Sequence, residues 1–410
     1  MVGRGPDRSV SCSALGPRYH SGKVPERVLF PVTLSFLLAL LCGPASAQTA
    51  PPQTRAEALR QERARKAQEV TPNEADALQR AMTYIEGRGL LVSRRDGFHP
   101  KLGSLTTGSG FALGVGYRDR DLFQRRGVFE AWTAASLKKY WAVEARVGLQ
   151  ERAAGRLMAD AVASIREYPR EAFFGLGPDS RREDYSEFAL RTPEVAARVG
   201  ARLVPALTVG GGIGVLSPRT NTGTTDFVRS SGFLEVDYRE PLNARRGGWY
   251  RFDLSQFDDR NGGNWSFRRT DLDLRQYLGF LADRRVIALR ALVSSSHATG
   301  GSTGVPFYLM PTLGGNDTLR GFRNYRFRGP HALLFQAEYR WELWSGLDAA
   351  LFYDAGKVAL RRSDLNFSKL QDDYGVGFRF NTANGVVMRV DAAFGSPDGK
   401  HLHIVFGGVF

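Results

Sequence analysis

The sequence predicts an all-β protein, a 16-stranded antiparallel transmembrane β-barrel with a short N-terminal helical periplasmic arm. Three observations predict this fold. From Gly97 onward, apolar and polar residues alternate, the period of a strand with one apolar and one wet face. A secretory signal precedes these segments, and the chain ends on an alternating strand that closes with Phe410. Hydrophobic residues make up 42% and charged residues 24%, values that exclude disordered and collagen-like chains.

Residues 1–47 are predicted to be the signal peptide. Arg27 precedes an apolar core at 28–42, and a small-x-small cleavage site ends at Ala47. A membrane-anchoring helix is the alternative, but the core is short and Pro31 interrupts it. Both cysteines precede the cleavage site, so we expect no disulfide in the mature chain.

Residues 48–96 are predicted to form the helical periplasmic arm. The segment 71–74 (TPNE) is typical of a helix start, with Thr as the cap, Pro in the first turn and Glu three residues after the cap. An arm of this length is too short to bury a core of its own. The barrel is therefore expected to span residues 97–410.

Alternation is clearest near the end of the chain. Between Leu333 and Leu343 the odd positions are apolar or aromatic, while Glu338 and Arg340 belong to the opposite face. A soluble sandwich would bury the apolar face, whereas a membrane barrel turns it toward lipid and lines its lumen with charge. Aromatic residues at strand ends favour the barrel, because they resemble an interfacial girdle. These are Tyr339, Trp341, Trp344, Trp249 and Tyr250.

Turn signals divide the barrel into sixteen strands with both termini on the periplasmic side. Long connections, such as 174–184 and 298–331, are then extracellular, and tight turns are periplasmic. The strands are expected near 97–106, 109–121, 127–137, 139–150, 156–173, 185–203, 206–217, 226–240, 248–260, 267–282, 285–297, 332–343, 346–360, 370–382, 385–396 and 401–410.

The longest connection, 298–331, is rich in Gly and Arg, and a loop of this length in a compact barrel is usually functional or disordered. It contains Leu319–Phe322 (LRGF). Two strands later stands Phe352–Gly356 (FYDAG), and Glu338 lies on the strand between. The phase of the two strands turns Glu338 and Asp354 inward.

These motifs, with the terminal Phe, resemble those of the BamA/TamA outer-membrane assembly superfamily, also called the bacterial surface antigen family. The chain resembles a compact member without POTRA modules. The resemblance implies that the loop, the sixth outer loop of the family, folds into the lumen. There a tip arginine would pair with acidic residues of the wall. It implies the loop-six set Arg320, Gly321, Phe322, Glu338, Asp354 and Gly356, and the C-terminal insertion signal Phe406 and Phe410.

The junction of the first and last strands is expected to be weak. Pro100 cannot donate to a ladder, and Gly407 and Gly408 make the last strand flexible. A weak seam would suit lateral opening into lipid, the mode of action that the family implies. The alternative is that barrel ends merely tolerate Pro and Gly.

These features predict an outer-membrane protein that assists insertion or translocation of polypeptide or lipid, with no enzymatic activity, cofactor or metal. His401 and His403 share one strand face, but they are interpreted as polar lumen residues. Expected partners are outer-membrane lipid and lipopolysaccharide, unfolded outer-membrane or secreted polypeptides, and a periplasmic subunit bound through residues 48–96. The net charge of +14 favours anionic lipid over nucleic acid in a secreted chain. Alternatives are a passive pore, a surface antigen without assembly activity, and an outer-membrane hydrolase.

Overall fold

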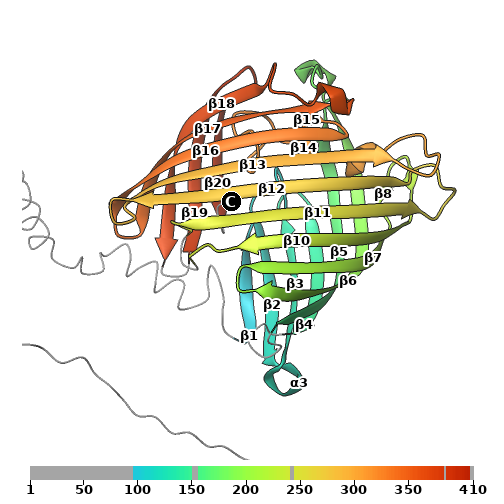
Figure 1. The fold of residues 1–410 in the computed structure, drawn as a ribbon. Coiled ribbons are helices and arrows are strands. Elements are labelled where there is room, and N and C mark those ends of the chain that lie inside the picture. Colours follow the sequence, from blue (N-terminus) through green and yellow to red (C-terminus); the bar gives the residue numbers. More distant parts are fainter. Residues whose placement is uncertain (1–95, 150–155, 241–243, 383–384, 407–410) are drawn as a thin grey trace, which may run out of the picture. The chain divides into compact units, whose positions relative to one another are not determined.

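The described part of the chain is a β-barrel (Figure 1). The computed structural model describes residues 96–149, 156–240, 244–382 and 385–406, all within the compact unit Val70–Phe410. These residues form sixteen long strands, each paired antiparallel with the next along the chain. The predicted all-β, 16-stranded barrel is confirmed. The predicted signal peptide and, except for Asp96, the helical arm lie outside the described residues.

The long strands match the predicted ranges to within a few residues, because the alternating pattern and the turn residues mark the same boundaries. They are β1 (Gly97–Gly103), β2 (Ala112–Asp121), β3 (Gly127–Ser136), β4 (Trp141–Leu149), β5 (Leu157–Phe173), β6 (Ser186–Val204), β7 (Leu207–Leu216), β10 (Phe227–Asp237), β11 (Gly247–Asp259), β12 (Phe267–Phe280), β13 (Arg285–Ala298), β16 (His331–Trp344), β17 (Leu347–Ala359), β18 (Gln371–Thr382), β19 (Gly385–Ser396) and β20 (Gly399–Phe406).

The remaining elements are short pieces within the connections. No helix among the described residues is long and apolar enough to cross a membrane. The short elements are α3 (Leu122–Arg125), the 3₁₀ turns η1 (Arg182–Asp184), η2 (Phe307–Leu309) and η3 (Arg362–Asp364), and the two-residue strands β8 (Arg219–Thr220), β9 (Gly223–Thr224), β14 (Thr312–Leu313) and β15 (Phe327–Arg328).

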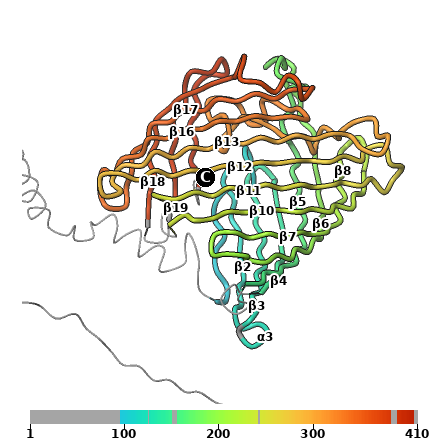
Figure 2. The backbone as a smooth tube through the Cα atoms, in the orientation of Figure 1, coloured from blue at the N-terminus to red at the C-terminus, as the bar shows by residue number. Residues whose placement is uncertain are grey.

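The two ends of the barrel differ. At one end, here called the turn end, connections are as short as 205–206 and 345–346. The opposite end, here called the loop end, carries the connections 174–185 and 299–330. Figure 2 shows the backbone passing back and forth between these ends. The segment 299–330 is named loop six below.

Most large apolar side chains of the strands point outward and most charged ones inward, as the alternation predicts. Tyr339 and Trp341 stack on the outer face at the turn end, with ring centroids 5.8 Å apart. The assignment of Trp249 to an outer aromatic girdle is wrong. Its ladder partner is Arg275, whose guanidinium lies 4.6 Å from the indole centroid. Directly opposed residues share one face of a sheet, so the indole follows the charge into the lumen.

The barrel has a seam between its first and last strands. β1 and β20 lie close together, but among the described residues β1 pairs with β2 and β20 with β19, and no ladder joins β1 to β20. Pro100 lies in β1, opposite Val115 of β2. Gly407, Gly408, Phe410 and the side chain of Phe406 lie outside the described residues.

Candidate functional site

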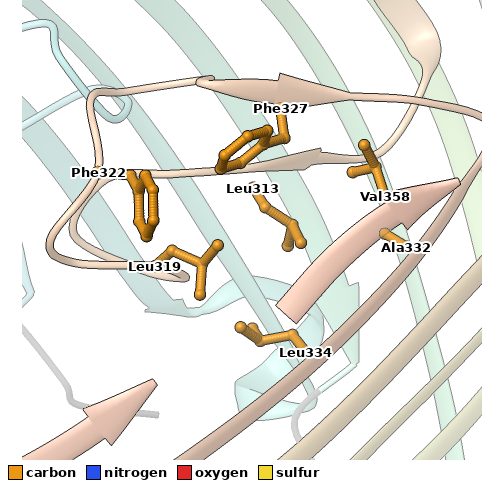
Figure 3. Close-up of a cluster of buried hydrophobic side chains, with 7 residues drawn as sticks. All are labelled: Leu313, Leu319, Phe322, Phe327, Ala332, Leu334 and Val358. Carbon is orange, nitrogen blue, oxygen red and sulfur yellow. The ribbon is translucent and has the colours of Figure 1, made fainter. Parts of the chain in front are cut away.

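Loop six folds into the barrel and packs an apolar cluster against the inner wall (Figure 3). Phe322 and Phe327 meet edge to face, with ring centroids 5.2 Å apart. Burying a side chain of this size contributes about 1.5–3 kcal/mol, so the cluster anchors the loop before any polar contact is counted. Its members are Leu313, Leu319, Phe322 and Phe327 of the loop, Ala332 and Leu334 of β16, and Val358 of β17.

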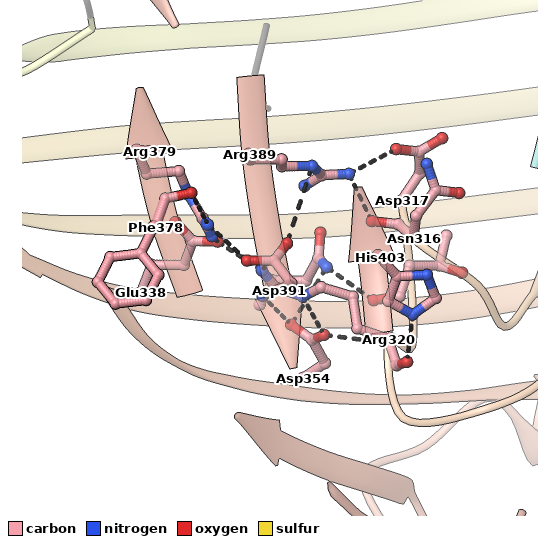
Figure 4. Close-up of polar contacts among 12 residues, drawn as sticks. Asn316, Asp317, Arg320, Glu338, Asp354, Phe378, Arg379, Arg389, Asp391 and His403 are labelled. Carbon is pink, nitrogen blue, oxygen red and sulfur yellow. Dashed lines mark hydrogen bonds and ion pairs between the residues drawn. The ribbon is translucent and has the colours of Figure 1, made fainter. Parts of the chain in front are cut away.

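Arg320 occupies the centre of the site and is 0% exposed (Figure 4). Its Nε and Nη2 donate to the two oxygens of Asp354, both at 2.7 Å, and its Nη1 donates to Oε1 of Glu338 at 2.6 Å. Nη1 also lies 3.6 Å from Oδ2 of Asp391. Burial opposes the charge, but these carboxylates raise the pKa of Arg320 well above its ordinary value. The structure thus brings together the three charged residues that the resemblance implied.

The spacing of Phe352, Asp354 and Gly356 on β17 follows from this contact. Alternate residues of a strand share a face, so all three point at the loop. The guanidinium carbon of Arg320 lies over the Phe352 ring, 3.5 Å from the ring centroid. A Cβ on Gly356 would lie 2.7 Å from the Leu333 carbonyl oxygen, so only glycine fits there. The motif therefore supplies a ring, a carboxylate and space at three successive inward positions.

A wider charge network surrounds this pair. Arg379 of β18 donates to Glu338 Oε1 at 2.7 Å and also to Asp391, and Arg340 donates to Glu338 Oε2 at 2.7 Å. Arg389 of β19 donates to Asp317 Oδ1 of loop six at 2.9 Å. The inward phase of these residues was readable in the sequence. Their pairing was not, because it depends on strand register.

At Gly321 the loop lies directly against β18 and β19 of the wall. A Cβ there would lie 2.5 Å from Cβ of Asp373 and 3.2 Å from the Phe394 carbonyl oxygen. Asp373 itself is 1% exposed, and neither of its carboxylate oxygens has a hydrogen-bond partner among the described residues. The Gly after Arg320 is thus required by the closeness of β18 and β19, and a larger residue would push the loop tip away from Asp354.

Loop six also contacts both sides of the seam. On the β20 side, Nε2 of His403 donates to the Arg320 carbonyl oxygen at 2.7 Å, and Oδ2 of Asp398 accepts from the Arg323 backbone N–H at 3.1 Å. Beyond β1, Thr106 and Tyr325 share a hydrogen bond of 2.7 Å between their hydroxyls. A hollow of about 470 Å³ lies at the seam. It is lined by residues 103–104, 106–108 and 110–111, by Lys138, Asn316 and Asn324, and by residues 402–405.

Two further arginines tie the loop to distant walls. Arg328 donates to Oε1 of Glu171 on β5 at 2.6 Å, and both residues are buried. Arg326 donates to the Ser180 carbonyl oxygen at 2.8 Å and pairs with Asp398 at 3.4 Å. The loop therefore reaches from β16–β19 across the lumen to β5. The sequence showed these arginines but not their partners.

The two histidines of β20 are not arranged with further ligands. His401 and His403 stack with ring centroids 6.1 Å apart. In the described ranges no cluster of three or more His, Cys, Asp or Glu side chains is placed to hold a metal ion. The contact of His403 with the Arg320 carbonyl assigns it to the loop-six site.

Comparison with known protein families identifies the family to which this barrel belongs. The model of the Omp85 superfamily domain matches residues 105–408. The chain belongs to the Omp85 superfamily. The resemblance inferred from LRGF and FYDAG is therefore confirmed, and the match begins just after β1 and includes all the later strands. No curated protein matches the chain.

Solved structures share the Omp85 barrel fold with this chain at low sequence identity. BamA from Haemophilus ducreyi lacking POTRA domains 1–3 is 12% identical with a TM-score of 0.59, and the match covers 77% of this chain and 71% of that one. CdiB from Escherichia coli is 12% identical with a TM-score of 0.56, covering 76% and 62%. CdiB from Acinetobacter baumannii is 13% identical with a TM-score of 0.50, covering 75% and 58%. The chain therefore spans less than two thirds of the CdiB chains.

Arg320→Ala should lower the free energy of unfolding by about 3–5 kcal/mol, because it leaves buried carboxylates unpaired. Arg320→Lys should restore only part of the loss, since an ammonium cannot bind Asp354 through two parallel hydrogen bonds. Urea midpoints and heat-dependent gel mobility measure the effect. Arg260→Ala, an exposed change outside loop six, is the control and should stay within about 0.5 kcal/mol. Equal midpoints for Arg320→Ala and the wild type would contradict the pairing.

Gly321→Ala should lower the free energy of unfolding by about 1–3 kcal/mol, because the new Cβ overlaps Asp373. Gly304→Ala is a matched control in the same loop. Its Cβ would meet nothing closer than Trp265 at 4.0 Å. The same urea titration compares the two, and a loss for Gly304→Ala as large as that for Gly321→Ala would refute the steric argument.

Proposed function

We propose that this Omp85 protein is a non-enzymatic barrel of the bacterial outer membrane that assists the insertion or translocation of polypeptide or lipid. The observation that carries the proposal is the unpaired seam, which loop six bridges from within. Bacterial outer-membrane barrels have short periplasmic turns and longer extracellular loops, so the loop end would be extracellular and the turn end periplasmic.

An unpaired seam has a chemical consequence in a membrane. Strand edges expose backbone N–H and C=O groups, and in hydrocarbon each unsatisfied group costs several kcal/mol. Such an edge is stabilised by water, by a covering element or by another strand. An extended polypeptide that adds a strand to β1 or β20 would satisfy these groups, the recognition mode known as β-augmentation. The seam hollow of about 470 Å³ provides space beside both edges.

The partners follow from this proposal. Unfolded outer-membrane or secreted polypeptides would be the clients at the seam. Outer-membrane lipid, including lipopolysaccharide, would contact the outer face. A periplasmic subunit bound through residues 48–96 remains a prediction, because the arm lies outside the described residues.

A passive pore is the second candidate. A hollow of about 500 Å³ at the turn end, lined in part by Arg202, Glu235, Asp237 and Arg239, is polar and favours a wet vestibule. Loop six, however, fills the opposite end of the lumen. Planar-bilayer conductance separates the two functions: small or flickering currents support the plugged barrel, and large steady channels support the pore.

Tethering the seam should abolish activity. We expect Ser104→Cys with Leu402→Cys, joined by a reducible cross-linker, to lower client insertion into vesicles at least tenfold, because both positions line the seam hollow. The client probe is an unfolded outer-membrane barrel polypeptide. Leu113→Cys with Ala135→Cys is the control, since these residues are already partners in the β2–β3 ladder. Full activity with the seam tethered would refute opening at this junction.

Outward residues should behave as lipid-facing. Val199 of β6 is 63% exposed and faces outward, opposite Gly211 of β7. Val199→Arg should cost about 2–4 kcal/mol in vesicles, because the charge enters hydrocarbon. In a water-soluble barrel the same change would stay within about 0.5 kcal/mol. Urea titration of vesicle-folded protein measures the difference, with Val199→Ala as the control.

A further inference from the structure

The outer wall carries an apolar hollow of about 330 Å³ over β11, β12, β13, β16 and β17. Its outward-facing lining is Tyr250, Leu274, Gln276, Leu289, Ala291, Phe335, Ala337 and Tyr353. The volume lies within the range of about 300–1,000 Å³ that is common for small-molecule sites.

Two alanines create this hollow. Ala291 lies between Leu274 and Phe335 in one row of ladder partners, and in the next row Ala337 lies between Leu289 and Tyr353. In each row the larger neighbours form walls around a methyl-sized floor. The loop-end lip is formed by Phe367, which is 76% exposed and stacks on Phe335 with centroids 5.6 Å apart.

Cationic and imidazole side chains lie above the hollow at the loop end. Arg268 is the ladder partner of His297, and Ser295 is the partner of His331 and shares a hydrogen bond of 2.8 Å with its Nδ1. Arg361 follows the end of β17 in an extended conformation, two residues after Ala359, the partner of His331.

These basic groups are not neutralised locally. Arg268 donates to the neutral Gln256 at 3.4 Å, and no carboxylate of the described residues pairs with Arg268 or Arg361. The acids near this rim are already hydrogen-bonded: Asp258 by Gln256, Asp372 by the Tyr353 hydroxyl, and Asp364, in the turn after Arg361, by the Ser363 hydroxyl. An anionic group is therefore the complement of this rim.

The rim lies at headgroup height if the barrel spans a membrane. From His331 to Trp341 the chain runs about 33 Å, which at a tilt of about 45° is a height of about 23 Å. This matches the apolar band of about 25 Å in outer-membrane barrels. Trp341 stacks with Tyr339 at the turn end, so His331 marks the opposite interface. Phe335 lies about 13 Å along the strand from His331 toward the turn end, which places it within the acyl region.

We propose that this face is a specific site for an outer-leaflet glycolipid of the lipid A type, with a phosphate at Arg268, His297 and Arg361 and an acyl chain in the hollow over Ala291 and Ala337. A lipid with phosphates on a rigid sugar core and several acyl chains can bind the basic rim and the apolar hollow at the same time. The site rests on the membrane orientation of the proposed function but not on any insertion activity.

Native mass spectrometry of the full protein purified in detergent tests the site, with lipid A, dephosphorylated lipid A and phosphatidylglycerol as probes. We expect lipid A to bind at least tenfold more tightly than either other lipid. The triple variant R268Q/H297Q/R361Q should lose this preference. Ala337→Phe, which fills the hollow, should weaken lipid A binding about tenfold with the charges intact.

Arg191→Gln is the matched control. Arg191 also faces outward near the loop end, but it pairs with Glu167 at 3.8 Å and does not line the hollow. It should bind lipid A like the wild type. Equal binding of phosphatidylglycerol and lipid A, or unchanged binding by the triple variant, overturns the proposal. Heat-dependent gel mobility confirms that each variant is folded. Because no client is present, a failed insertion assay leaves this result unaffected.

Discussion

The fully buried cation of Arg320 determines which charged side chains must line the barrel wall around it. Burying an unpaired guanidinium costs many kcal/mol, so the N–H groups of Arg320 require carboxylate partners. β16, β17 and β19 each supply one: Glu338, Asp354 and Asp391. Three carboxylates carry more negative charge than Arg320 alone can balance, and Arg340 and Arg379 pair with Glu338 and Asp391. The inward charges of four adjacent strands thus form one network centred on the loop tip.

Space around the tip is as constrained as charge. Neither Gly321 nor Gly356 has room for a Cβ: at Gly321 it would meet the Asp373 side chain, and at Gly356 it would meet the Leu333 carbonyl oxygen of the neighbouring strand. The apolar residues at Leu319 and Phe322 place hydrophobic anchors on either side of the cation. In the sequence Leu-Arg-Gly-Phe, the first and last residues pack in the apolar cluster, the Arg pairs with the carboxylates, and the Gly leaves space for Asp373. A change at any of them displaces the others, because the interior is close-packed.

The strands and the inner pair Asp354 and Glu338 were predictable from sequence, because a period of two assigns each side chain to a face without knowledge of the partners. The network beyond them was not. Arg379 meets Asp391 only through the register of β18 and β19, and Arg328 meets Glu171 across the lumen. Trp249 was misplaced for a related reason: aromatic residues at a strand end suggest an interface, but the phase of that strand turns this one inward.

Magnitudes indicate which part of loop six would move first. The contacts toward β1 include two neutral side-chain hydrogen bonds, Thr106 with Tyr325 and Thr107 with Asn316, and each such bond contributes about 0.5–1.5 kcal/mol. Breaking the buried contacts of Arg320 with Asp354 costs about 3–5 kcal/mol. β20 is bonded to the same tip through His403. We therefore expect β1 to separate from a loop and a last hairpin that remain in place, so that the seam opens while the lumen stays plugged.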